Sequence, residues 1–152
     1  MIPLAERFPP SESCSCEICL NYCKRPGWWT PEEFENLLTT NYYKRVMLEV
    51  SPEHTFGVLS PAFYGCEGNF SLQIYSKNGC NFLKNNRCEL YNSGYTPLEC
   101  RFCHHDRIGE GQECHSVLEN EWNSDAGRNL IDTWIKKANF PYADYYYQIT
   151  KR

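Results

Sequence analysis

The spacing of apolar residues predicts a short helix in the first third of the chain. The stretch 30–33, Thr-Pro-Glu-Glu, has the composition of a helix start, because threonine caps a helix and proline fits its first turn. Glu33 can close a capping box with the threonine. Apolar residues then recur at helical spacing through Leu38, so we expect an amphipathic helix that ends near residue 40.

The middle of the chain changes to a pattern that favours strands. Two compact apolar runs, 46–50 and 55–59, are each followed by a Ser-Pro pair that interrupts regular structure. In the stretch 70–75, Phe, Leu and Ile alternate with Ser, Gln and Tyr, which is typical of a half-buried strand. Asn78-Gly79 predicts a tight turn directly before Cys80.

The last third returns to helical spacing. Apolar residues between 117 and 122 suit a short helix. A clear apolar stripe from Leu130 to Ala138 follows Ser124-Asp125, which is a good helix start. The tail 142–147 is dense in tyrosine, and we expect it to form an edge strand.

Composition and charge narrow the class of protein. The 152 residues carry 15 Lys and Arg against 19 Asp and Glu, and no basic run exceeds two residues, so we expect no nucleic-acid partner. The start of the chain lacks a basic and apolar leader, and no stretch approaches the length of a membrane span. We therefore expect a cytoplasmic protein with no membrane partner. Aromatic residues make up 15% of the chain, so the core has to rely on rings whose polar tips need partners.

The ten cysteines are the most informative feature of the sequence. Cytoplasmic thiols stay reduced, so closely spaced cysteines indicate a metal site more than a disulfide framework. Cys16, Cys19 and Cys23 are separated by two and three residues, which lets one loop wrap around a single tetrahedral metal. Cys14 is too close to Cys16 for both to chelate comfortably. The alternative is that these thiols are buried and act as small apolar side chains.

A second cysteine group lies in the loop-rich stretch 80–114. Its members are Cys80, Cys88, Cys100 and Cys103. They can close a four-thiolate site of their own or complete the first group across the fold, and spacing does not choose between the two. Cys114 or a neighbouring histidine can supply a ligand from a third direction. The histidines beside cysteines are His104, His105 and His115. Cys66 has no partner at ligand spacing. The stretch 100–104 also matches the C-x-x-C-H pattern of haem attachment, which requires export.

These motifs resemble the YkgJ-type cysteine-cluster family, which is described as zinc- or iron-chelating and includes a flagellin lysine N-methylase branch. The family carries an N-terminal C-x-x-C-x-x-C-C box. Its first, second and fourth cysteines are matched by Cys16, Cys19 and Cys23, whereas Tyr22 stands in place of the third. Its second half is similar to 80–83 (Cys-Asn-Phe-Leu), 88–91 (Cys-Glu-Leu-Tyr) and 97–103 (Pro-Leu-Glu-Cys-Arg-Phe-Cys). The resemblance implies a metal- or cluster-binding fold, in which Cys114 or a histidine could replace the missing thiolate. It carries no methyltransferase site over to this chain.

The sequence as a whole predicts an α+β protein. We expect one small loop-rich domain, 1–152, with a short β-sheet and a few helices organised around cysteine-ligated metal centres. The expected metal ligands are Cys16, Cys19, Cys23, Cys80, Cys88, Cys100, Cys103 and Cys114. The expected cofactor is zinc or an iron–sulfur cluster, because thiolates suit both. Closed zinc sites would be structural, whereas a cluster would allow electron transfer or regulation.

Two other kinds of function fit the same residues. A centre held only by Cys16, Cys19 and Cys23 would leave one metal position open for water or substrate, as in an enzyme. Trp28-Trp29 could then line a pocket, although such a pair more often packs in the core. A zinc-ribbon-like module that binds a protein partner is the other alternative.

Overall fold

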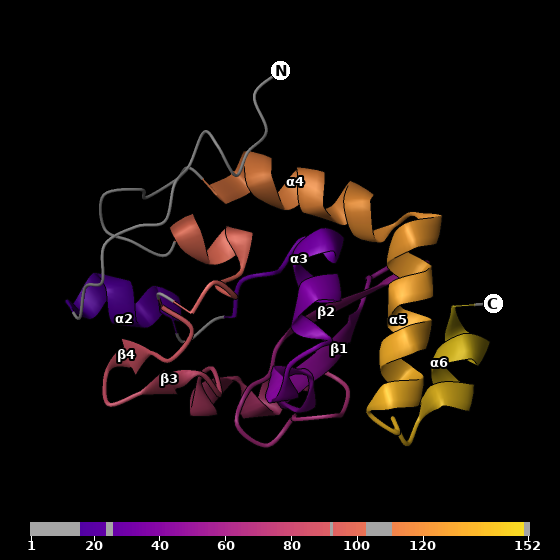
Figure 1. The fold of residues 1–152 in the computed structure, drawn as a ribbon, viewed down its shortest axis with the longest axis horizontal. Coiled ribbons are helices and arrows are strands. Elements are labelled where there is room, and N and C mark those ends of the chain that lie inside the picture. Colours follow the sequence, from indigo (N-terminus) through magenta and orange to yellow (C-terminus); the bar gives the residue numbers. More distant parts are fainter. Residues whose placement is uncertain (1–15, 24–25, 92, 103–110, 151–152) are drawn as a thin grey trace.

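The fold is built on a pair of antiparallel strands near the middle of the chain (Figure 1). The computed structural model describes residues 16–23, 26–91, 93–102 and 111–150. Strands β1 (Val46–Val50) and β2 (Gly57–Pro61) pair over their full lengths. Ser51 closes the loop between them, because its hydroxyl accepts the backbone N–H groups of Thr55 and Phe56 at 3.0 and 3.2 Å. Both strands predicted from apolar runs are confirmed, the second one two residues later than expected.

Helices pack on this sheet and on one another. Helix α5 (Asp125–Lys137) packs against β2, and both α3 (Pro31–Leu37) and α4 (Gly111–Trp122) pack against α5. Helix α6 (Ala143–Ile149) is joined to α5 by the Tyr147 hydroxyl, which donates to Asp132 at 2.8 Å. The combination of helices with a short antiparallel sheet confirms the α+β class.

The helix starts follow the predicted capping residues. Thr30 accepts the backbone N–H of Glu33 at 3.0 Å, and the Glu33 carboxylate accepts that of Thr30 at 2.9 Å, which completes the capping box of α3. Ser124 caps α5 by accepting the backbone N–H of Gly127 at 3.1 Å. These local signals therefore identified two of the helix starts correctly.

The predicted strand at 70–75 is wrong. The segment makes a single bridge, between Phe70 and β1, and then turns into the 3₁₀ helix η2 (Gln73–Asn78). Phe70 is held by aromatic contacts, with its ring centroid 4.9 Å from that of Phe140. The next two apolar residues, Leu72 and Ile74, remain exposed. Alternating hydrophobicity was misleading because, of Phe70, Leu72 and Ile74, only Phe70 packs against the main core.

The predicted edge strand in the tyrosine-rich tail is also wrong, because these residues form α6. The backbone N–H of Tyr146 donates to the carbonyl of Tyr142 at 3.0 Å, and Tyr146 is fully buried. Tyr142 and Tyr145 are about half exposed. A helix buries one tyrosine of this run against α5 while its neighbours stay at the surface.

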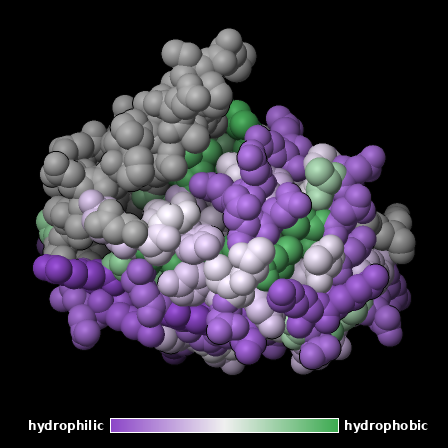
Figure 2. Space-filling model, viewed as in Figure 1, coloured by the Kyte–Doolittle hydropathy of each residue, from purple (hydrophilic) through white to green (hydrophobic). Residues whose placement is uncertain are grey.

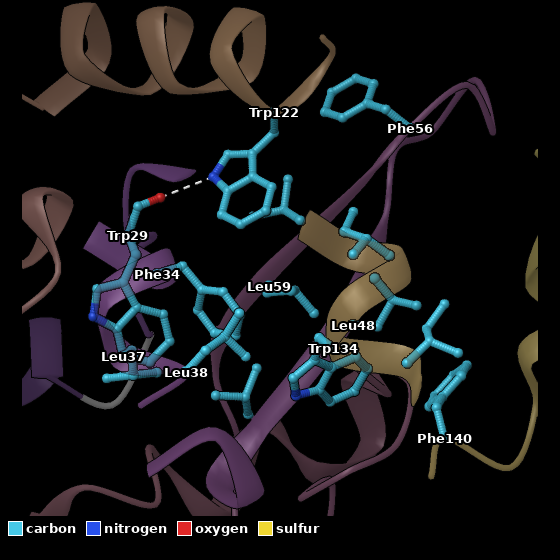
Figure 3. Close-up of a cluster of buried hydrophobic side chains, with 14 of the residues drawn as sticks. Trp29, Phe34, Leu37, Leu38, Leu48, Phe56, Leu59, Trp122, Trp134 and Phe140 are labelled. Carbon is cyan, nitrogen blue, oxygen red and sulfur yellow. Dashed lines mark hydrogen bonds between the residues drawn. The ribbon is translucent and has the colours of Figure 1, made fainter. Parts of the chain in front are cut away.

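The main core is aromatic, and the indole N–H groups of its three buried tryptophans are all hydrogen-bonded (Figure 3). Trp29, Trp122 and Trp134 are fully buried. Their indole N–H groups donate to the backbone carbonyls of Tyr95, Trp29 and Tyr43 at 2.7, 2.8 and 3.0 Å respectively. Each of these tryptophans therefore links two distant segments by a hydrogen bond, which compensates for the small number of aliphatic residues.

Short elements make up the end of the molecule that lies away from α5 and α6, at the left of Figure 1. They are α2 (Glu17–Cys23), β3 (Leu83–Lys84), β4 (Arg87–Cys88) and the 3₁₀ helix η3 (Leu98–Phe102). Strands β3 and β4 form a hairpin whose two turn residues, Asn85 and Asn86, have φ of 51° and 63°. Asparagine tolerates this left-handed conformation, which a two-residue hairpin turn requires. We call α2, the hairpin and η3 the cysteine end.

The surface is mixed in character. Figure 2 shows hydrophilic residues over much of one face, with hydrophobic residues in narrower strips between them. Within the part of the chain that the structure describes, no helix is both long enough and apolar enough to cross a bilayer.

Candidate metal centre

Cys16, Cys19 and Cys23 lie on or beside α2, not in the loop that the sequence suggested. Cys16 directly precedes this seven-residue helix and Cys23 is its last residue. The Sγ atom of Cys16 accepts the backbone N–H of Cys19 at 3.5 Å, as an N-cap side chain does. Cys16 is exposed and Cys19 is buried. The spacing puts positions 16, 19 and 23 on one face of the helix. Cys14 and the side chain of Cys23 lie outside the described part of the chain.

The chain that leaves α2 runs directly against the second cysteine group. Gly27 is buried, and a Cβ built on it would lie 2.8 Å from the Sγ atom and 2.8 Å from the backbone N of Cys100. Neither distance leaves room for a side chain, so only glycine fits here without displacement. Cys100, half-buried in η3, is therefore in contact with the segment that follows the first cysteine group.

Hydrogen bonds hold these two segments together. The backbone N–H of Trp28 donates to the Glu99 carboxylate at 3.1 Å, and the backbone N–H of Glu99 donates to the Trp28 carbonyl at 3.2 Å. The bond from the Trp29 indole to Tyr95 adds a third link. We call the paired stretches 27–29 and 95–100 the seam. The seam fixes Cys100 relative to the exit of α2.

A histidine and two carboxylates lie beside the seam. The Nδ1 atom of His115, on α4, is 2.7 Å from Glu99, and its Nε2 atom is 3.1 Å from Glu119. The imidazole packs on Trp28, with ring centroids 4.3 Å apart. In this arrangement each ring nitrogen of His115 lies within hydrogen-bonding distance of a carboxylate.

Glu49 is a third carboxylate at the seam. It accepts the Trp28 indole N–H at 3.1 Å. Burial raises the pKa of Glu49, and the nearby charge of Glu99 raises it further, whereas the Trp28 hydrogen bond and His115 act in the opposite direction. Glu49 was not among the site residues predicted from the sequence. The feature that could have indicated it is that it is the one acidic residue in the apolar run 46–50.

Cys80 and Cys88 have different surroundings from Cys100. Cys80 is 7% exposed, makes a single bridge with Phe63 and belongs to the main apolar cluster. Cys88 stands opposite Leu83 in the hairpin, is half-buried and packs against the same cluster. The structure thus brings Cys100 to the seam and places Cys80 in the core.

Cys114 and Cys66 lie in two separate small clusters. Cys114 is fully buried on α4 with Leu98 and Leu118, and Trp28 packs against this group, so Cys114 adjoins the seam. Cys66 is a buried, free thiol in a cluster of three other buried residues, Met47, Ala62 and Phe63. Cys66 is the clearest case of a thiol that serves only as apolar packing.

The described residues do not complete a metal site by themselves. Cys103, His104 and His105 lie outside them, as does the side chain of Cys23. Among the residues that are described, no three Cys, His, Asp or Glu side chains are arranged to hold a metal ion. The donor type does suit zinc or iron, because both prefer thiolates.

The resemblance to the cysteine-cluster family remains a prediction from the motifs. The chain matches no protein-family model, no curated protein and no solved structure. The function therefore has to be inferred from the residues and their geometry.

Proposed function

We propose that the protein binds a thiolate-ligated metal centre, either zinc or an iron–sulfur cluster, with a structural or a redox and regulatory role. One observation carries the proposal: positions 16, 19 and 23 share one face of α2, a helix of only seven residues. Such a spacing offers three soft donors from a single short segment. We also propose that the protein works in the cytoplasm, where these thiols stay reduced.

The environment of the first thiols suits ligands. A hydrogen bond from the Cys19 backbone to the Cys16 Sγ atom favours the thiolate, which is the form that binds metal. Hydrogen bonds to sulfur also tune the reduction potential of a cluster. A bound zinc would cross-link the cysteine end, whereas a cluster would add one-electron chemistry there.

The cysteine end has a physical need for such a cross-link. Its helix α2 has seven residues and its hairpin strands have two each. Isolated helices of this length are marginal in water, and so are isolated two-stranded hairpins. Metal binding contributes directly to folding where packing is insufficient.

The test is the metal content and visible spectrum of the protein purified without oxygen. Brown protein with iron and acid-labile sulfide supports a cluster, and colourless protein with stoichiometric zinc supports a closed structural site. A chain that folds normally with no metal and ten reactive thiols would contradict the proposal.

A pair of cysteine variants makes the test specific. Cys19→Ser removes a buried thiol of α2, and we expect it to lose the metal. Cys66→Ala removes an equally buried thiol from a separate apolar cluster, and we expect it to retain the metal in full. Equal loss of metal in both variants would point to a general effect of unfolding and against a centre at α2.

A further inference from the structure

We propose that Asn78 is a site of spontaneous hydrolytic modification, at which water converts the side-chain amide to a carboxylate at a rate that the fold controls. Asn78-Gly79 is the only Asn-Gly pair in the chain. Asparagine is one of the thermolabile residues, and it is most labile before glycine, because no side chain shields the backbone nitrogen of glycine. Both residues lie outside the cysteine end, so the proposal is independent of the metal centre.

The reaction needs no reagent other than water. The backbone nitrogen of Gly79 attacks the Cγ atom of Asn78 and gives up its proton, and the side-chain nitrogen takes up that proton and leaves as ammonia. Water then adds to either carbonyl carbon of the resulting cyclic imide and breaks the bond from that carbon to nitrogen. The product is aspartate, or isoaspartate with the main chain running through the former side chain. Both products carry a new carboxylate.

Hydrogen bonds hold both reacting groups in the folded protein. Asn78 is the exposed last residue of the 3₁₀ helix η2, and Gly79 follows it, buried, with φ of 77°. The Nδ2 atom of Asn78 donates to the carbonyl of Tyr64 at 2.8 Å. The backbone N–H of Gly79 donates to the carbonyl of Ser76 at 3.1 Å. The attacking nitrogen and the leaving nitrogen are therefore engaged with different partners, so the ring closes only when η2 opens.

Tyr75 is the side chain that keeps η2 closed. Its ring lies so near the backbone of Gly65 that a Cβ built there would be 2.6 Å from it, and it packs on the small cluster that contains Cys66. The preceding residue, Ile74, is 75% exposed. Short 3₁₀ helices have poorer hydrogen-bond geometry than α-helices, and surface segments open locally far more often than the core does. The rate of modification therefore follows the population in which η2 is open.

The modification loosens the segment that Asn78 holds. The backbone N–H of Tyr64 donates to the Gly79 carbonyl at 3.1 Å, so residues 78 and 79 bind Tyr64 through both its N–H and its carbonyl. A carboxylate at position 78 has no N–H to donate, and it repels the Tyr64 carbonyl. Cys66, which follows Tyr64 by two positions, is fully buried in the wild type. The product should therefore make the Cys66 thiol accessible.

Peptide mapping by mass spectrometry tests the site. Folded wild type is incubated at mildly alkaline pH and sampled over weeks, and we expect Asn78 to be modified before any other asparagine, with isoaspartate among the products. Urea should raise the rate at least about tenfold, because it removes the hydrogen bonds on both nitrogens. Modification that begins at another asparagine, or a rate that urea leaves unchanged, would overturn the proposal.

A pair of neighbouring variants tests the control by η2. Tyr75→Ala should speed the modification of the folded protein about tenfold, because the helix loses its contact with Gly65 and opens more often. Ile74→Ala is the matched control on the same helix, and its rate should equal that of the wild type. Equal rates in the two variants would refute the control by η2.

Labelling of Cys66 tests the consequence. Asn78→Asp carries the charge of the product, whereas Asn78→Gln keeps an amide donor. A water-soluble maleimide, read out peptide by peptide, should label Cys66 faster in Asn78→Asp than in the wild type and at the wild-type rate in Asn78→Gln. Equal labelling of Cys66 in all three proteins would show that the modification does not release this segment.

Discussion

The core and the cysteine end of this protein are held together in different ways. The core buries large rings, and its tryptophans are hydrogen-bonded to distant backbone groups, as Trp122 is to the Trp29 carbonyl. The cysteine end consists of very short elements that are linked to the core by the hydrogen bonds of the seam. One region is stabilised by the packing of buried rings, whereas the other consists of short elements attached by hydrogen bonds. Cys19, Cys23, Cys88 and Cys100 lie in these short elements.

Metal removal should produce the largest difference between the two regions. We expect chelation of the reduced protein to expose residues 16–30 and 83–102 to protease, while the near-ultraviolet circular dichroism of the buried tryptophans persists. Structural metal binding contributes on the order of 10 kcal/mol in small domains, far more than any single side chain. Loss of the tryptophan signal at the same chelator concentration would show that the two regions unfold as one unit.

Trp134→Ala should damage the core alone. The ring is fully buried and its indole N–H donates to Tyr43, so we expect a loss of about 3–5 kcal/mol in the free energy of unfolding by urea. Ile74→Ala, at a side chain that is 75% exposed, should stay within about 0.5 kcal/mol of the wild type. If Trp134→Ala released metal from folded protein, the separation of the two regions would be wrong.

Glu33→Ala should weaken the connection between the regions. Its carboxylate accepts backbone N–H groups on both sides, from Thr30, the N-cap of α3, and from Leu98 in the seam. Removing an acceptor from the buried Leu98 N–H costs about 1–3 kcal/mol. Part of this cost is offset at Glu121, whose pKa is raised by burial and by the charges of Glu33 and Glu32. Glu33→Gln keeps an acceptor oxygen, and its urea midpoint should fall between those of the wild type and Glu33→Ala.

Glu49→Gln should have the smallest effect, and the effect should depend on pH. Burial and Glu99 raise the pKa of Glu49, so the folded protein holds this proton more tightly than the unfolded chain does. The stabilisation is complete below the unfolded pKa and is lost as the pH rises through the folded one. The wild type should therefore lose stability relative to Glu49→Gln between acidic and neutral pH. Parallel stability–pH curves for the two proteins would contradict the assignment.

The sequence predicted those parts of the fold that depend on local chemistry. The capping box of Thr30 and Glu33 and the Ser124 cap were correct, because each is settled within four residues. The tyrosine-rich tail was assigned wrongly, since the same rings suit a strand or a helix until the packing of Tyr146 decides. Likewise, the ring of Phe70 contacts that of Phe140, which is far from it in the sequence, and no local pattern reveals that contact.

The candidate site shows the same difference between local features, which can be predicted from the sequence, and long-range contacts, which cannot. The ligand groups predicted from cysteine spacing stay a prediction, and the loop that was expected around the first group is in fact the helix α2. The contact of Gly27 with Cys100 spans 73 positions and involves a residue with no side chain, so nothing in the sequence marked it. Glu99 was also missed, because its role lies in hydrogen bonds to Trp28 and His115 that only the folded chain brings together.

The adjacent tryptophans Trp28 and Trp29 have a practical consequence for following this molecule in solution. Trp29, Trp122 and Trp134 are sealed in the core, whereas Trp28 is half-buried at the seam beside His115 and Cys114. The fluorescence of Trp28 therefore reports on the cysteine end. A soluble quencher reaches this half-buried ring more easily than the three buried ones, so its signal can be separated from theirs. With Trp28→Phe as the blank, changes at the cysteine end, including any that metal causes, can be timed in the unlabelled protein.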